Sequence, residues 1–461
     1  MRTRLCCVRN FLYADVSAGK KEDDNKQNQM NILDKAERER IIRLVKREVV
    51  PAIGCTEPIC VALCVARATE ILNEKPESII VKLSANILKN AMGVGIPGTG
   101  MVGLPIAIAL GALIGKSDYQ LEVLKDVKKE DVEEGKTFIA EKRIKIQLKE
   151  DITEKLYVEA LVKASDGHSA TAIIAGSHTH FVFLADGEKV LLDERQPAGE
   201  TESDDQYDLN LRKVYDFSMG TPLEEIEFIR EARTLNEAAS AQALKGCYGH
   251  ELGKTLSRPM GRGILGDTIF SHILSSTSCA CDARMAGAMI PVMSNSGSGN
   301  QGICATMPVV IFAEENHNTD EELIRALMLS HLTAIYIKQS LGVLSALCGC
   351  VVASTGSSCG ITYLMGGGYE QISFAVKNMI ANLTGMICDG AKPSCALKLT
   401  SGVSTAVLSA MLAMQKKCVS SVEGIIDDDV DKSIHNLTSI GAEAMNETDK
   451  MVLDIMIHKS C

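Results

Sequence analysis

The spacing of apolar residues changes along this chain, and this change constrains the fold more than any other feature. Residues 137–195 contain five short β-rich runs, among them KLYVEALVKA and THFVFLAD, separated by turns that contain Asp. Such runs predict the strands of a small antiparallel sheet. From about Phe217 onward the apolar residues recur at helical spacing, broken by Gly- and Ser-rich loops. The sequence therefore predicts an α+β fold, with a mainly helical domain and a small domain that holds a mixed α/β sheet.

These patterns divide the chain into four segments. Residues 1–29 are polar and poorly patterned, and we expect them to form a loose N-terminal extension. Residues 30–125 combine helical patterns, one strand and a Gly-rich loop, and we expect them to pack on the helical domain. Residues 126–205 are expected to form the small β-rich α+β domain, which ends in an acidic stretch typical of a surface linker. Residues 206–461 are expected to form the helical domain.

The composition argues against nucleic acid and against a membrane as partners. Of the 461 residues, 48 are Lys or Arg and 59 are Asp or Glu, so the net charge of −11 has the wrong sign for nucleic-acid binding. The longest apolar runs, such as residues 101–115, are shorter than the roughly 18 residues of a membrane-spanning helix. The N-terminus lacks the apolar stretch of a secretory signal. We therefore expect a cytoplasmic protein that acts on a small molecule.

Two glycine motifs resemble nucleotide-binding loops but lack essential parts of them. Residues 93–98 match GxGxxG after a predicted strand, yet no second strand ends in an acidic residue about 20 positions later, as dinucleotide binding requires. Residues 111–117 have one residue too few between the glycines for a phosphate-binding loop. Neither motif therefore predicts a nucleotide site.

A third Gly-rich loop, at residues 294–302, is a stronger candidate for binding. Its sequence SNSGSGNQG has no aliphatic residue, so its polar groups must form hydrogen bonds with other groups or with water. Successive backbone N–H groups that lead into a helix form a seat for an anion such as a carboxylate. A purely structural turn is the alternative. The candidate binding residues are Ser294, Asn295, Ser296, Gly297, Ser298, Asn300 and Gln301.

Several of the 16 cysteines lie in loops, where thiolates can turn toward a common metal. Cys348 and Cys350 form one pair, Cys388 and Cys395 form another, and Cys55 is a further loop thiol. The spacings leave open a metal or iron–sulfur site and, as the alternative, small buried side chains. The remaining cysteines that we interpret as buried are Cys60, Cys64, Cys247, Cys304, Cys359 and Cys418. His178 and His180 are expected on one face of a strand, as a structural pair.

Five separated stretches carry a family resemblance. They are REVVPAIGCTEP, NILKNAMGVGIPGTG, DARMAGAMIPVMSNSGSGNQG, LCGCVVASTGSSCGITYLMGG and ICDGAKPSCALK, in that order between about residues 34 and 455. Together they resemble the L-cysteine desulfidase group, which is related to the α-chain of iron–sulfur L-serine dehydratases. The resemblance implies a pyridoxal-independent lyase with a [4Fe–4S] cluster in its helical catalytic domain. Such an enzyme converts L-cysteine to hydrogen sulfide, ammonia and pyruvate, or L-serine to ammonia and pyruvate.

The resemblance also implies where the cluster is held. Its ligands carry over onto Cys55, Cys350, Cys388 and Cys395, with Cys348 as the alternative to Cys350. In the dehydratases the last two cysteines are more widely separated than they are here. Cys461, at the end of the chain, is assigned no role.

The resemblance leads to expectations for the rest of the site. The substrate is expected to lie between the Gly-rich loop with Gly98 and Thr99 and the loop at residues 294–301. The candidates for the base that removes the Cα proton are Cys55, Glu57 and Lys392. Size and family also lead us to expect a homodimer. The alternatives are a metabolite sensor without turnover and a zinc-dependent hydrolase.

Overall fold

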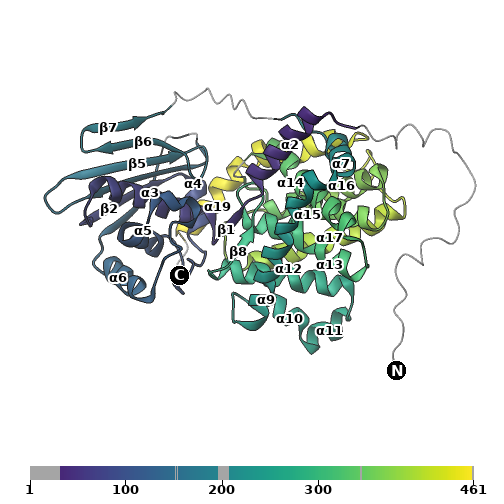
Figure 1. The fold of residues 1–461 in the computed structure, drawn as a ribbon, viewed down its shortest axis with the longest axis horizontal. Coiled ribbons are helices and arrows are strands. Elements are labelled where there is room, and N and C mark those ends of the chain that lie inside the picture. Colours follow the sequence, from purple (N-terminus) through teal and green to yellow (C-terminus); the bar gives the residue numbers. More distant parts are fainter. Residues whose placement is uncertain (1–31, 151, 153, 196–206, 343–344, 459–461) are drawn as a thin grey trace, which may run out of the picture.

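The computed structural model describes residues 32–150, 152, 154–195, 207–342 and 345–458, which form a sheet domain and a helical domain side by side (Figure 1). The extension expected at residues 1–29 and the thiol of Cys461 lie outside the described residues.

The sheet domain is built from a six-stranded mixed sheet with helices packed against it. The strands lie in the order β3-β2-β4-β5-β6-β7; β2 and β3 are parallel, and the other pairs are antiparallel. Helix α3 packs directly on β4 and β5, and α5 packs on α3. The elements are β1 (Pro51–Ile53), α3 (Thr56–Leu72), β2 (Ser78–Leu83), α4 (Ala85–Ala91), α5 (Leu104–Ile114), α6 (Lys129–Ala140), β3 (Ile144–Leu148), β4 (Tyr157–Lys163), β5 (Ser169–Ala175), β6 (Phe181–Asp186) and β7 (Lys189–Asp193).

The five strands expected between residues 137 and 195 are confirmed as β3 to β7. Strand β2 comes from the segment that was expected to pack on the helical domain, yet it lies between β3 and β4. Its alternate residues Ile79, Val81 and Leu83 are fully buried, because this period-2 face points toward the covering helices. Residues on both sides of position 125 therefore share one sheet, a pairing that composition alone does not reveal.

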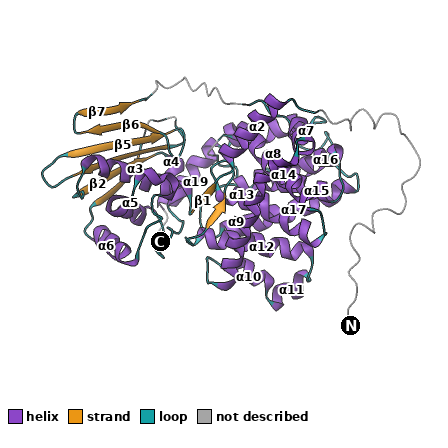
Figure 2. Ribbon diagram, in the orientation of Figure 1, coloured by secondary structure: helices purple, strands orange, loops and turns teal. Residues whose placement is uncertain are grey.

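The helical domain surrounds a central helix, α15, which packs against α13, α14, α16 and α17 (Figure 2). Most of α15 is buried, as expected for a helix that is apolar or small on all sides. The other main helices of this domain are α2 (Lys35–Glu48), α7 (Leu211–Gly220), α9 (Glu231–Lys245), α10 (Leu252–Ser257), α11 (Pro259–Leu265), α12 (Ile269–Met285), α13 (Gly299–Glu315), α14 (Asp320–Leu341), α16 (Tyr369–Leu383), α17 (Cys395–Met414), α18 (Val430–Ser439) and α19 (Asn446–His458), with α15 at Gly349–Leu364.

Helix α17 is the one helix of the described chain that is long and apolar enough to cross a membrane by length and composition. Half of that stretch is buried inside the protein. The core helices of soluble proteins have the same character, so this helix is weak evidence for a membrane span.

Backbone contacts join the domains. Strand β1 pairs with β8 (Pro291–Met293), between the domains in Figure 1. In the Gly-rich loop, Gly95 donates its N–H to the carbonyl oxygen of Met285 at 3.0 Å. A Cβ atom at Gly95 would lie only 2.4 Å from the carbonyl carbon of Ala286, so no larger residue fits there. This loop therefore packs closely against the helical domain.

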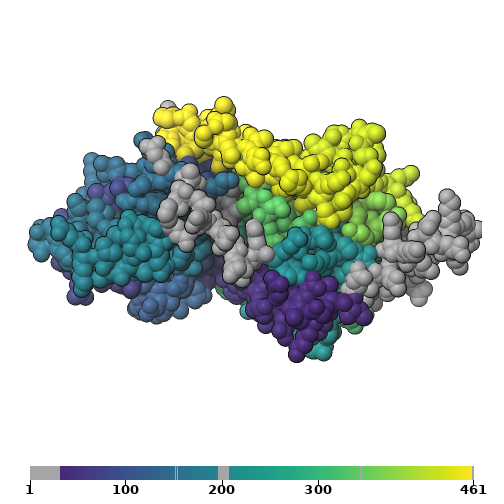
Figure 3. Space-filling model, turned by 90° about the horizontal axis from the view of Figure 1, so that it is seen from above, coloured from purple at the N-terminus to yellow at the C-terminus, as the bar shows by residue number. Residues whose placement is uncertain are grey.

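The C-terminal part of the chain also connects the domains. In Figure 3 the yellow C-terminal residues run across the molecule from the helical domain to the sheet domain. Helix α19 reaches α4, where Lys89 forms an ion pair with Asp449. The segment around Cys388 contacts the same lysine, through a hydrogen bond from Lys89 Nζ to the Cys388 carbonyl at 3.4 Å.

Candidate active site

A pocket lies where the two domains meet, and it encloses about 100 Å³. One water needs about 10–15 Å³ by this measure, so the pocket has room for a small molecule. The sheet domain and the segment leading into it contribute Cys55, Glu57, Asn90 and His178, and the helical domain contributes the remaining lining residues.

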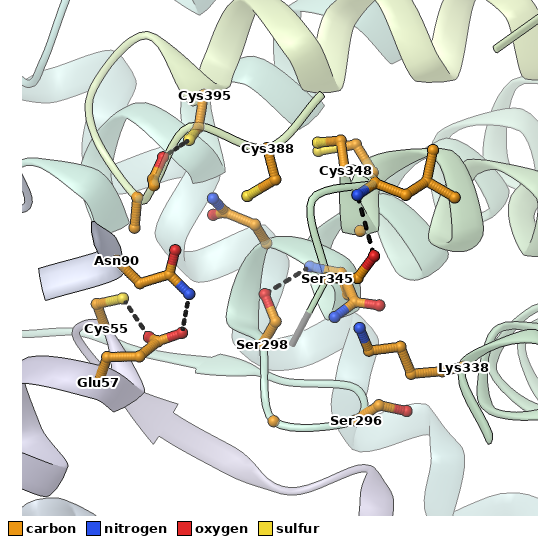
Figure 4. Close-up of a pocket in the computed structure, with 18 of the residues that line it drawn as sticks. Cys55, Glu57, Asn90, Ser296, Ser298, Lys338, Ser345, Cys348, Cys388 and Cys395 are labelled. Carbon is orange, nitrogen blue, oxygen red and sulfur yellow. Dashed lines mark hydrogen bonds between the residues drawn. The ribbon is translucent and has the colours of Figure 1, made fainter. Parts of the chain in front are cut away.

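The structure brings the two cysteine loops together at this pocket (Figure 4). The backbone N–H of Cys348 donates to the carbonyl of Met386 at 2.9 Å, and that of Cys388 donates to the carbonyl of Ala346 at 2.6 Å. These reciprocal bonds hold the loops side by side. Cys395, at the first position of α17, lines the same pocket.

The surroundings of these thiols keep them protonated unless a cation is near. Burial raises the pKa of Cys388 and raises that of Cys395 to about 11. The pKa of Cys348 is raised by a hydrogen bond with Cys350 and by burial, and the pKa of Cys350 is raised by its hydrogen bond with Cys304. Metal ligation requires thiolates, which a bound cation stabilises. The crowding of buried thiols around one pocket therefore suits a positively charged metal group.

The spacing of the donors bears on which metal group fits. Among the described residues, no group of three His, Cys, Asp or Glu side chains is close enough to hold a single metal ion. The iron atoms of a cubane cluster lie at separate corners, so its ligands stand farther apart than those of one ion. The chemical type of the donors, several cysteine thiols at one pocket, matches the ligands of iron–sulfur clusters.

Cys55 lines the same pocket, and its thiol is hydrogen-bonded to a carboxylate (Figure 4). It is the N-cap residue of α3, and its thiol donates to Glu57 Oε2 at 2.9 Å. Glu57 also accepts from Thr56 Oγ1 at 3.1 Å and from Asn90 Nδ2 at 3.0 Å. Burial and the Glu57 charge raise the pKa of Cys55 well above its usual value. The resting pair is therefore a thiol that donates to an ionised carboxylate.

His178 differs from the sequence expectation. It lies in the turn before β6, and its side chain is buried in the pocket, whereas His180 is exposed near Glu194. The two histidines therefore do not share a face of a strand. Burial lowers the pKa of His178, although the Glu57 charge opposes this shift.

The ionisation of Glu57 and His178 is coupled. Burial alone would raise the pKa of Glu57, but nearby His178, the Cys55 hydrogen bond and the charge of Arg284 together lower it. The carboxylate has three donors of its own, and no hydrogen bond to the imidazole is found in the described chain. At neutral pH we therefore assign an ionised Glu57 and a neutral His178.

The candidate loop at residues 294–302 divides into two parts. The first part is structural: Ser294 Oγ donates to the carbonyl of Val50 at 2.6 Å, and Asn295 Nδ2 donates to His331 Nδ1 at 3.1 Å. The second part faces the pocket and comprises Ser296, Gly297, Ser298, Asn300 and Gln301.

Three other candidate residues lie outside the pocket. Gly98 and Thr99 belong to the loop that packs the domains together, and they do not line the pocket. Lys392 forms an ion pair with Asp389 at 2.6 Å and donates to the carbonyl of Gly390 at 3.2 Å. Its ammonium group is thus engaged within its own loop rather than directed at a substrate.

Sequence reasoning missed two cations that line the pocket. Arg284 lies near the end of α12, and Lys338 lies near the end of α14, in otherwise apolar or small surroundings. Burial lowers the pKa of Lys338 to about 8. The available signal was a cationic residue inside an apolar or small-residue helical pattern: Arg284, which follows Asp282, in CACDARMAG, and Lys338 in AIYIKQ.

Unpaired polar atoms concentrate in this pocket. Within the described part of the chain, four buried atoms that belong to lining residues have no hydrogen-bond partner: Asn90 Oδ1, His178 Nε2, Arg284 Nε and Gln301 Oε1. Leaving such atoms unsatisfied is costly, and native proteins do so rarely. The pocket therefore offers unpaired donors and acceptors to a polar ligand.

Comparison with known families agrees with this arrangement. The family described as serine dehydratase alpha chain matches residues 118–454. The chain belongs to this family. Membership makes it a lyase-type protein, and the family is associated with iron–sulfur serine dehydratases. The match includes both cysteine loops, whereas Cys55 and Glu57 precede it.

Close relatives extend over almost the whole chain. A UPF0597 protein of Bacteroides thetaiotaomicron is 73% identical over 424 residues, which cover 92% of this chain and 99% of the relative. A UPF0597 protein of Porphyromonas gingivalis is 54% identical and covers 93% of this chain and 100% of the relative. One from Shewanella halifaxensis is 47% identical, covering 91% and 98%. In each comparison, the match covers more than 90% of this chain and nearly all of the relative.

Proposed function

We propose that this protein is an iron–sulfur-dependent, pyridoxal-independent lyase that eliminates the β-substituent of a small L-amino acid. L-Cysteine is the proposed substrate, with hydrogen sulfide, ammonia and pyruvate as products. L-Serine is the second candidate, because the matching family is named for serine dehydratase. The observation that carries the proposal is the convergence of thiols from two distant loops on one pocket, which the hydrogen-bonded pair Cys55 and Glu57 also lines.

The residues proposed to hold a [4Fe–4S] cluster are Cys388, Cys395 and one member of the pair Cys348 and Cys350. Such a cluster, with one iron position open, supplies a Lewis acid for the leaving sulfur or oxygen. Cys55 is assigned a different role here, because its thiol is bound to Glu57.

Cys55 and Glu57 are proposed to move the Cα proton. Cys55 Sγ, which lines the pocket, would accept the Cα proton while its own proton passes to Glu57 Oε2 across the 2.9 Å hydrogen bond. The ionised carboxylate is thus the final proton acceptor, and no free thiolate has to form beside it. Asn90 and Thr56 hold the carboxylate in place for this exchange.

The test begins with protein purified without oxygen. We expect iron and labile sulfide in each chain, and pyruvate released from L-cysteine together with sulfide. Replacement of Cys388 or Cys395 by alanine should remove the iron. Cys247→Ala is the matched control, because this thiol, which the sequence analysis wrongly interpreted as buried, is exposed and does not line the pocket.

The outcomes separate the alternatives. Pyruvate from L-serine but not from L-cysteine would assign the dehydratase reaction. A protein that carries the cluster but releases pyruvate from neither amino acid would contradict the lyase and favour a sensor. Protein without iron, or with iron retained in both cysteine variants, would contradict the proposed cluster site.

A further inference from the structure

Arg284 is a buried cation for which no direct ion pair or hydrogen bond is found among the described residues. Its side chain lines the pocket and is only 2% exposed. Within the described residues it makes no ion pair or hydrogen bond, and its Nε atom is buried without an acceptor. An unpaired buried charge is strongly unfavourable, and buried arginines normally bind carboxylates or phosphates. The missing partner is therefore expected to be an anion that enters the pocket.

The position of Arg284 is set by the start of α13. A Cβ atom on Gly299 would lie 2.3 Å from Arg284 Nε and 2.9 Å from its Cδ, so the side chain crosses directly over this glycine. Gly299 is the first residue of the 17-residue helix α13. The arginine charge therefore lies against a helix N-terminus, which carries partial positive charge of its own.

The backbone at this helix start also offers free donors. Ser296 and Gly297 adopt consecutive left-handed conformations, with φ of 47° and 77°, and both line the pocket. In the described chain no hydrogen bond is found for the N–H groups of Gly299 and Asn300. Two sources of positive charge that lie side by side favour an anion within reach of both, and these N–H groups can donate to that anion.

We propose that Arg284 and the N-terminus of α13 bind the free carboxylate of an α-amino acid. The carboxylate site is inferred from the geometry alone. The further statement that the bound amino acid is the reacting substrate rests on the proposed lyase function. Arg284 is then a specificity-determining residue. Amino-acid amides and esters, and residues inside a peptide, should bind more weakly, because a neutral carbonyl group cannot form an ion pair with the buried arginine.

The experiment compares a ligand change with a side-chain change in the anaerobically purified protein. Affinities for L-serine and L-serinamide are measured by calorimetry with the wild type, Arg284→Gln and Arg284→Lys. The wild type should bind L-serine about 10- to 100-fold more tightly than the amide, the range expected for hydrogen bonds to a charged group. Arg284→Gln should lose this preference, and Arg284→Lys should keep part of it. Arg262→Gln is the matched control, because this arginine is 54% exposed and outside the pocket.

Thermal unfolding without ligand tests whether Arg284 is merely structural. Removal of an unpaired buried charge should leave the melting temperature of Arg284→Gln unchanged or higher, whereas loss of a structural arginine would lower it. The proposed carboxylate site is refuted if the wild type binds L-serine and L-serinamide with equal affinity, a result that needs no variant. It is also refuted if Arg284→Gln keeps the preference for L-serine. Binding of L-serine through Arg284 without pyruvate release would contradict the lyase and leave the carboxylate site intact.

Discussion

Replacing Asp449 with alanine should release the C-terminal helix α19 from the sheet domain. Asp449 forms an ion pair with Lys89, whose side chain is only 1% exposed. The same lysine donates to the carbonyl of Cys388 at 3.4 Å. A Cβ atom on Gly390 would lie 2.3 Å from the Lys89 carbonyl oxygen, so this loop also packs closely on α4. The ion pair therefore supports both α19 and one of the cysteine loops.

The expected magnitude follows from the burial of the lysine. Removing one partner of a buried ion pair costs about 3–5 kcal/mol, because the remaining charge is left uncompensated. Asp449 is 18% exposed, so we expect the lower end of this range. In a chain with two domains the local effect is best measured by hydrogen exchange of the α19 amides. About 3 kcal/mol corresponds to exchange about 100-fold faster.

Two comparisons make this prediction specific. Glu447→Ala, on the same helix, removes the ion pair with Lys450, and both of these side chains are more than 70% exposed. An exposed pair of this kind contributes about 0–1 kcal/mol, so α19 exchange should change little. The double variant Lys89→Met with Asp449→Leu should be less destabilised than Asp449→Ala, because no charge is left buried. Equal exchange in Asp449→Ala and Glu447→Ala would refute the reasoning.

Two further predictions concern ionisable groups. Glu57→Gln should lower the raised pKa of Cys55 and speed its alkylation by iodoacetamide, while lyase activity falls by at least about 100-fold; unchanged alkylation would contradict the assigned pair. Burial lowers the pKa of His272, but hydrogen bonds to Asp267 and Glu315 outweigh it and raise the pKa above its ordinary value. The resulting stabilisation is present at low pH and lost as pH rises through the raised pKa. His272→Gln should therefore lower the melting temperature at pH 5.5 more than at pH 9, and an equal loss at both values would exclude this linkage.

Much of the site was visible in the sequence because its chemistry requires unusual residue types in loops. The clustered cysteines, the GCTEP stretch and the polar loop before α13 all contribute residues to one pocket. Other features depended on neighbours far away in the chain. The backbone of Gly95 packs closely against Ala286, and His178 turns inward at a turn that the sequence analysis had interpreted as part of a strand.

Local pattern determined the helical and strand segments of this protein and the residues able to hold a metal, since both depend on periodicity and on residue chemistry along the chain. Tertiary structure decided which of those residues meet. Strand β2 joined the sheet through pairing with β3 and β4, and Arg284 acquired its importance only because burial left it without a direct ion pair among the described residues. Desolvation and long-range pairing act between segments that are distant in sequence, so no local pattern records them.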